Sequence, residues 1–277
     1  TIIISNCRWW KISFGARCED NLLDIATYKD DVWGQEVLNG VSWDLLWLVI
    51  VLAFIFIAGH AIYETTRKRA QKPSSEGARV NRHEAIDRLF HWIMAGSVFV
   101  LLITGIFPII GLNFAWLEIH WIAGIILTIV VVFHILRSFT QDLSSMALGP
   151  SDLKEALDET VKPGKYSPAQ KSMHMVVSIL TLLVIGSGLI MFLQIETPWW
   201  ERPNSLSEAT LGLVFFVHGI STLGLIGVIC LHIYFGLRPE KLFYTRSMIK
   251  GWISREEFNA HHDQQRWKPD ETTWNVS

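Results

Sequence analysis

Long apolar stretches separated by short polar segments dominate the pattern along this chain. Five of these stretches approach the run of about 20 apolar residues that crosses a lipid bilayer as a helix. They are residues 45–62, 89–110, 119–136, 173–192 and 211–237. The last is longer than one crossing requires, so its beginning is expected to project beyond the hydrocarbon. The pattern therefore predicts an all-α integral membrane protein with five spanning helices.

Composition agrees with this fold class, and the positions of the charges predict an orientation. Half of the residues are hydrophobic and 18% are charged, which is typical of membrane proteins. Lysine and arginine gather in the segments 64–88, 161–171 and 238–277, whereas residues 111–118 contain none and residues 194–206 contain only Arg202. Basic loops stay on the cytoplasmic side. The amino terminus is therefore expected outside and the carboxy terminus inside.

This orientation divides the chain into five expected parts. An outer, periplasmic amino-terminal segment is followed by a first transmembrane helix, a basic cytoplasmic linker, a four-helix bundle and a cytoplasmic tail. The expected bounds are 1–44, 45–63, 64–88, 89–237 and 238–277.

The three cysteines of the chain show no CxxC or metal-type spacing, which argues against a zinc or iron–sulfur site. Cys7 and Cys18 both precede the first apolar stretch. If that end faces an oxidising compartment they can form a disulfide, and two free thiols are the equal alternative.

Histidines inside the apolar stretches are the most informative chemical feature. Ionisable residues are rare in membrane spans and usually have a function there. A single histidine is often explained by a hydrogen bond to a neighbouring helix, but six together favour a shared chemistry. They are His91, His120, His134, His174, His218 and His232. The cores of the spans contain no acidic residue, since Glu118 and Glu208 lie at edges, and this disfavours a proton or metal transporter.

The spacing of the histidines suggests two stacked haems. His218 and His232 are fourteen residues apart, which returns them to nearly the same helix face about 21 Å apart along the axis. One helix can thus supply a ligand near each membrane surface, and bis-histidine haem b is often buried in such bundles. His120 lies at the depth expected of His218.

Three alternatives remain open at the depth of His232, where any of His91, His134 and His174 could face it. A swapped pairing is open too, because His134 follows His120 by fourteen residues. The other histidines are expected to be solvated surface residues. They are His60, His83, His261 and His262.

Several motifs together resemble one family. "AIDRLFHW" opens the second span, "EIHWIAGI" the third, "GKYSPAQK" precedes the fourth, "HGISTLGLIGVICLHIY" lies in the fifth and "SMIKGWISREEFNAHHDQQRW" follows it. In this order and spacing they resemble the γ subunit of membrane formate dehydrogenases over residues 81–267. That subunit is the dihaem cytochrome b anchor of a molybdenum- or tungsten-dependent complex. The first span resembles the longer form of the family, which has an additional amino-terminal helix.

The resemblance implies two haem b groups and their ligands. It assigns His91 and His232 to the cytoplasmic-side haem, and His120 and His218 to the outer haem. His134 and His174 fall where the family has apolar residues, so we expect them to tune the inner haem or to carry protons.

The resemblance also implies a quinone site in the "GKYSPAQK" stretch. Its expected residues are Lys165, Tyr166, Ser167, Ala169, Gln170 and Lys171. Ser167 replaces the family's usual asparagine, and Pro168-Ala169 replaces Ala-Gly. These departures leave open whether the quinone is menaquinone or ubiquinone.

The implied function is electron transfer from formate, oxidised by an outer partner, through an iron–sulfur subunit and the two haems to a quinone. The chain offers no catalytic residue for formate oxidation, so it is expected to act as the quinone-reducing subunit of an oxidoreductase complex. The resemblance implies a heterotrimer, or a higher oligomer of it, in a bacterial cytoplasmic membrane with the amino terminus periplasmic and the carboxy terminus cytoplasmic. No nucleic-acid binding is expected. The stretch before residue 45, with Trp9, Trp10 and Trp33, is the expected docking surface.

Two alternatives follow from the same observations. One is the cytochrome b subunit of a nickel–iron hydrogenase or a thiosulfate-type reductase, the second of which would reverse the electron flow. The other is a structural membrane anchor that holds haem without reducing quinone.

Overall fold

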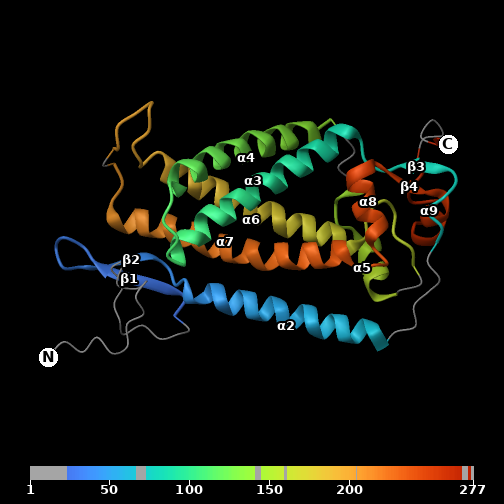
Figure 1. Ribbon diagram of the computed structural model, residues 1–277, viewed down its shortest axis with the longest axis horizontal. Helices are drawn as coiled ribbons and strands as arrows, with labels where there is room; N and C mark the ends of the chain where they lie inside the picture. Colours follow the sequence, from blue (N-terminus) through green and yellow to red (C-terminus); the bar gives the residue numbers. More distant parts are fainter. Residues whose placement is uncertain are drawn as a thin grey trace. The chain divides into compact units, whose positions relative to one another are not determined.

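The computed structural model describes residues 24–66, 73–140, 145–158, 161–203, 205–269 and 274–275 (Figure 1). The candidate disulfide between Cys7 and Cys18 lies outside these residues, as do Trp9 and Trp10. The helices are α2 (Asp44–Thr66), α3 (Ala85–Ile109), α4 (Trp116–Ser138), α5 (Pro150–Leu157), α6 (Pro168–Phe192), α7 (Glu208–Leu237), α8 (Leu242–Lys250) and α9 (Arg255–His261). The strands are β1 (Ala26–Asp30), β2 (Glu36–Val41), β3 (Arg79–Asn81), β4 (Trp252–Ser254) and β5 (Trp274–Asn275).

The predicted fold class is confirmed, because α2, α3, α4, α6 and α7 are each long and apolar enough to cross a membrane. Each of the predicted stretches falls almost entirely inside one of these helices. The helices extend beyond the apolar stretches mainly where polar residues continue the helical turns. In α6, for example, the helix begins at Pro168, whereas the apolar pattern begins at residue 173. Proline is well suited to a first helical position, since it has no backbone N–H to satisfy.

The chain divides into two compact units, and every spanning helix contributes a segment to each. The hairpin unit comprises residues 24–56, Ser97–Thr128 and Ser178–Val228. The tail unit comprises the described residues of Ile57–Gly96, Ile129–Val177 and Ile229–Ser277.

In the hairpin unit, β1 and β2 pair as an antiparallel ribbon, with Ala26 opposite Val41 and Asp30 opposite Glu36. The side chain of Asp31 closes the turn by accepting hydrogen bonds from the backbone N–H of Trp33 and of Gln35, at 2.9 and 2.8 Å. Such aspartate side-chain bonds are a common way to stabilise turns.

The ribbon packs on α7 through glycines. A Cβ on Gly212 would lie 1.7 Å from the carbonyl oxygen of Leu38, and a Cβ on Gly219 would lie 2.3 Å from Cγ1 of Val41. Both positions face β2 because they are two helical turns apart. Only glycine permits this approach of strand and helix.

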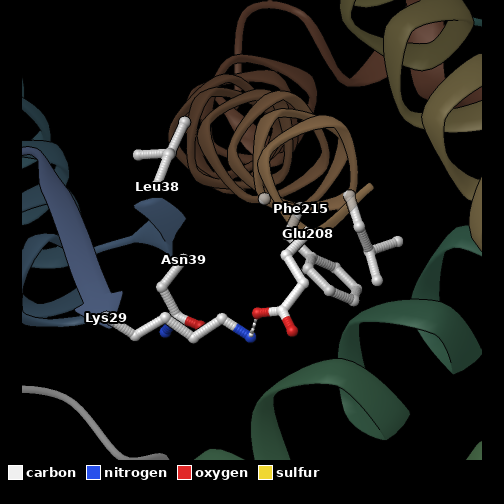
Figure 2. A pocket seen from close by; sticks show the side chains of 7 residues that line it. Lys29, Leu38, Asn39, Glu208 and Phe215 are labelled. Carbon is white, nitrogen blue, oxygen red and sulfur yellow. Dashed lines mark ion pairs between the residues drawn. The ribbon is translucent and has the colours of Figure 1, made fainter. Parts of the chain in front are cut away.

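A small pocket lies beside this contact (Figure 2). Lys29 of β1 and Glu208 of α7 form an ion pair across it at 3.1 Å. Its volume is about 20 Å³, which is room for about one water molecule. The pocket is therefore part of the ribbon–helix contact and too small for a cofactor.

In the tail unit, a small sheet of order β4-β3-β5 packs with α8 and α9 around a core of Val80, Phe243, Ile253 and Phe258. Helix α8 ends at Gly251, whose φ of 90° belongs to the left-handed region that favours glycine. Helix α9 begins with a capping box, in which Ser254 and Glu257 satisfy each other's backbone N–H. The motif "SMIKGWISREEFNAHHDQQRW" thus encodes a folded segment.

Candidate functional site: the paired histidines

The six histidines of the spans form three facing pairs. The ring centroids are 6.3 Å apart in each pair, and the ring planes are inclined by 54° to 63°. The pairs are His120–His218 in the hairpin unit, and His91–His232 and His134–His174 in the tail unit.

This separation fits two imidazoles that bind one iron from opposite sides. Each imidazole contributes an iron–nitrogen bond of about 2 Å and about 1.1 Å from the bonded nitrogen to its ring centre. Two imidazoles on opposite sides of the iron therefore have their ring centres about 6 Å apart. No group of three or more His, Cys, Asp or Glu that could hold a bare metal ion occurs among the described residues. Haem needs no such group, because the porphyrin supplies the other four nitrogens. The residues present therefore fit haem.

The tautomer of His120 is fixed by Thr104. The Thr104 hydroxyl donates to the carbonyl oxygen of Val100 at 2.7 Å, so it accepts the hydrogen bond from Nδ1–H of His120 at 2.8 Å. Nδ1 then carries the proton, and Nε2 keeps a free lone pair. Thr104 is 2% exposed, so this bond is shielded from water. Hydrogen bonds of this kind orient the ring of an iron-binding histidine and raise its basicity.

Ser187 serves His218 in the same way. Its hydroxyl donates to the carbonyl oxygen of Leu183 at 2.6 Å and accepts from Nδ1–H of His218 at 3.0 Å. Gly188 leaves room for the ring, since a Cβ there would lie 3.3 Å from Cε1 of His218. Both nitrogens available to a metal in this pair are therefore Nε2.

Sequence analysis did not identify the roles of these two hydroxyls. Serine and threonine are common in membrane helices, and their usual partner is the carbonyl four residues earlier. Thr128 is an example: its hydroxyl donates to the carbonyl oxygen of Gly124 at 2.7 Å and makes no hydrogen bond to a histidine among the described residues.

In the tail unit, the structure brings His232 opposite His91, which was one of three alternatives at that depth. The start of α3 is fixed on two sides. Arg137 of α4 binds Asp87 at 3.0 Å and also Glu84, and the indole N–H of Trp92 donates to the carbonyl oxygen of Met248 at 2.9 Å. These contacts hold the first turns of α3, and with them His91.

The predicted quinone stretch spans the start of α6 in the same unit, with residues 165–167 before the helix and residues 168–171 in its first turn. Tyr166 lies partly buried between the His83 ring, at 6.3 Å between centroids, and the Arg82 guanidinium, at 5.4 Å. Ser167 and Gln170 bind each other's backbone N–H at the start of α6. The Lys171 ammonium is buried and binds the Asp152 carboxylate at 2.9 Å, so it joins α5 to α6.

Charge and burial also shape the titration of this region. Burial raises the pKa of the Tyr166 hydroxyl and lowers the pKa of the Lys165 ammonium. Burial, with the charge of Arg82 second, lowers the pKa of His83 to about 3. Tyr166 is therefore a neutral hydrogen-bond donor at neutral pH, and His83 is uncharged.

The expectation that His262 is a solvated surface residue is wrong. It is 1% exposed, and its Nδ1–H donates to the carbonyl oxygen of Gly164 at 2.6 Å. Its Nε2 accepts from Arg82 at 3.0 Å, and Arg82 also donates to the carbonyl oxygen of Lys165 at 2.7 Å. Because the tail folds back on residues 164–166, a histidine far from any span becomes buried. Burial, and then Arg82, lowers its pKa to about 3.

His60 also differs from the prediction of a solvated residue. It lies within α2, partly buried, with Nδ1 at 2.9 Å from the Tyr234 hydroxyl of α7. His83 and His261 are each partly buried.

Spanning helices with paired, haem-compatible histidines define a multi-pass membrane cytochrome b. The profile of the prokaryotic cytochrome b561 family matches residues 82–251, and the chain belongs to this family. The chain is also similar to the "formate dehydrogenase, cytochrome b556 subunit" of Haemophilus influenzae. The two are 23% identical over 217 residues, which cover 71% of this chain and 85% of that protein. Both matches confirm the resemblance predicted from the sequence.

Proposed function

We propose that this chain is the cytochrome b subunit of a formate dehydrogenase complex and passes electrons from formate oxidation to a quinone. The observation that carries the proposal is two facing histidine pairs, His120–His218 in the hairpin unit and His91–His232 in the tail unit, in a chain similar to a formate dehydrogenase cytochrome subunit. Formate oxidation releases carbon dioxide, one proton and two electrons in a partner subunit. The chain itself supplies the membrane part of the electron path.

The basic segments support a periplasmic amino terminus and a cytoplasmic carboxy terminus. An iron–sulfur subunit would then dock at the periplasmic side and connect this chain to a molybdenum- or tungsten-containing catalytic subunit. The turn between β1 and β2 supports such docking, since Val32 is 82% exposed and Trp33 is 84% exposed. Exposed tryptophans are frequent anchors of protein interfaces.

We assign His120 and His218 as axial ligands of the periplasmic-side haem, and His91 and His232 as those of the cytoplasmic-side haem. Haem b, when bound, carries one electron at a time between iron(III) and iron(II). Thr104 and Ser187 hold the first two imidazoles in the tautomer that presents Nε2. This fixed geometry limits the rearrangement that accompanies each electron transfer.

The quinone site is proposed at residues 165–171, where the tail unit meets the cytoplasm. The Tyr166 hydroxyl and the Lys165 ammonium are the donors that would bind a quinone carbonyl. A pKa lowered by burial makes Lys165 the better proton donor of the two. Lys171 has a positioning role, because its ammonium binds Asp152. Reduction of the quinone consumes two electrons and two protons, and the protons would come from the cytoplasm.

Two histidine variants of the purified complex test this assignment. His232→Ala is expected to abolish formate-driven quinone reduction while formate still reduces the haem held by His120 and His218. His120→Ala is expected to block the reduction of both haems by formate. Quinone reduction that survives His232→Ala would show that the tail-unit haem is not on the path and would favour a structural anchor.

A further inference from the structure

The third histidine pair, His134 and His174, supplies no ligand to the two haems of the proposed electron path. His134 lies on α4 and His174 on α6, both in the tail unit and both inside spanning helices. In the described part of the chain, neither imidazole has a hydrogen-bond partner. Two unpaired polar rings in a span cost several kcal/mol, so an occupant that uses both nitrogens is expected.

Geometry limits what that occupant can be. With 6.3 Å between the centroids, the ring nitrogens approach no closer than about 4 Å, which is too far for a direct hydrogen bond. One metal atom between them requires this separation. A bare ion such as zinc would need three or four protein ligands, and no such group exists among the described residues.

The His134–His174 pair also matches the His91–His232 pair of the same unit. The centroid separations are equal, the ring planes are inclined by 61° and 54°, and each pair has one partly buried and one exposed imidazole. The two pairs share no helix, because His91 and His232 come from α3 and α7. Ligation at one pair therefore takes no ligand from the other.

We propose that His134 and His174 are the axial ligands of a third haem b. The site adds one further one-electron carrier to the tail unit, beside the start of α6 where the quinone stretch ends. The proposal goes beyond the proposed function, and it shares with that function the premise that paired histidines hold haem.

Haem stoichiometry of the purified complex tests the proposal. We expect three haems per chain in the wild type and two in each of His134→Ala, His174→Ala and the double variant. The double variant should lose no more than either single variant, because both residues hold the same iron. His60→Ala is the matched control, since His60 is a span histidine whose partner is the Tyr234 hydroxyl, and it should retain three.

A methionine variant keeps the test decisive if the alanine variants fail to assemble. His174→Met should retain three haems, one of them with a raised midpoint potential, because methionine ligation raises the potential of haem iron. A water bridge or a proton path between the rings would produce no such change.

Two haems in the wild type, with the same two in the His134 and His174 variants, would overturn the proposal. Two haems plus one copper or zinc ion that the variants lose would overturn it in favour of a metal-ion site. A preparation without any haem would instead refute the proposed function.

Discussion

Replacing Thr104 by valine tests whether its hydroxyl supports haem ligation by His120. Valine keeps the shape and the β-branch of threonine but removes the oxygen that accepts the Nδ1–H bond at 2.8 Å. In the haem-free chain the imidazole can turn or change tautomer. Once Nε2 is bound to iron the ring is fixed, and Nδ1–H stays buried without a partner.

The expected cost follows from that unpaired group. A buried donor without a partner costs about 1–3 kcal/mol, and loss of such a supporting bond weakens metal binding by about 10- to 100-fold. Thr104→Val should therefore lose the His120–His218 haem at lower detergent or competitor concentrations. It should also raise that haem's midpoint potential, because a less basic imidazole stabilises iron(III) less.

Redox titration monitored by absorbance, with haem content measured in parallel, is the appropriate assay. The haem held by His91 and His232 serves as an internal reference. Thr128→Val is the matched control, since Thr128 bonds only the Gly124 carbonyl of its own helix. Thr104→Ser should behave as the wild type. Equal haem retention and potential in Thr104→Val and Thr128→Val would show that the Thr104 hydroxyl does not support haem ligation by His120.

Three further predictions concern packing, docking and pH. Gly212→Ala should displace the ribbon, because the new Cβ would lie 1.7 Å from the Leu38 carbonyl oxygen. The free energy of unfolding should fall by about 1–3 kcal/mol, and the thermal midpoint should fall with it. Gly186→Ala is the control, because a Cβ there has no atom within 4 Å, and it should be neutral or stabilising. Equal thermal midpoints for the Gly212 and Gly186 variants would contradict the close packing of the ribbon on α7. Trp33→Ala should lower the amount of partner subunits that co-purify with the chain, at unchanged haem content. Co-purification at the wild-type level would refute docking at the turn between β1 and β2. Burial holds the pKa of His262 at about 3, against 6.5 for an ordinary histidine, so the unfolded state binds more protons as the pH falls below 6.5. The free energy of unfolding should therefore fall by about 1.4 kcal/mol per pH unit. A flat profile from pH 7 to pH 5 would exclude this burial.

Hydrophobic length alone was enough to predict the spanning helices, because a bilayer imposes a minimum run of apolar residues on any helix that crosses it. The histidines in the spans could be recognised for a similar reason, since a polar group there needs a partner. Depth did not select the partner of His232. That choice depends on how α3, α4 and α6 rotate about their axes, which the positions of histidines along the chain do not encode.

Contacts between distant segments account for what the sequence did not reveal. The burial of His262 depends on the return of the tail to Gly164 and Arg82, and it has no local signature. The roles of Thr104 and Ser187 depend on which helix faces each hydroxyl. The short strands β3 and β4 have no clear alternating pattern, because three-residue strands are too short to show one.

An anaerobic absorption spectrum of the purified complex, recorded after addition of formate and then of dithionite, is the decisive test of whether electrons from formate reach haems held by the paired histidines. Formate alone should reduce the b haems held by the paired histidines, and added quinone should reoxidise them. Haems that dithionite reduces and formate does not would contradict the formate dehydrogenase assignment. A spectrum without any b-haem band would contradict the role of the paired histidines altogether.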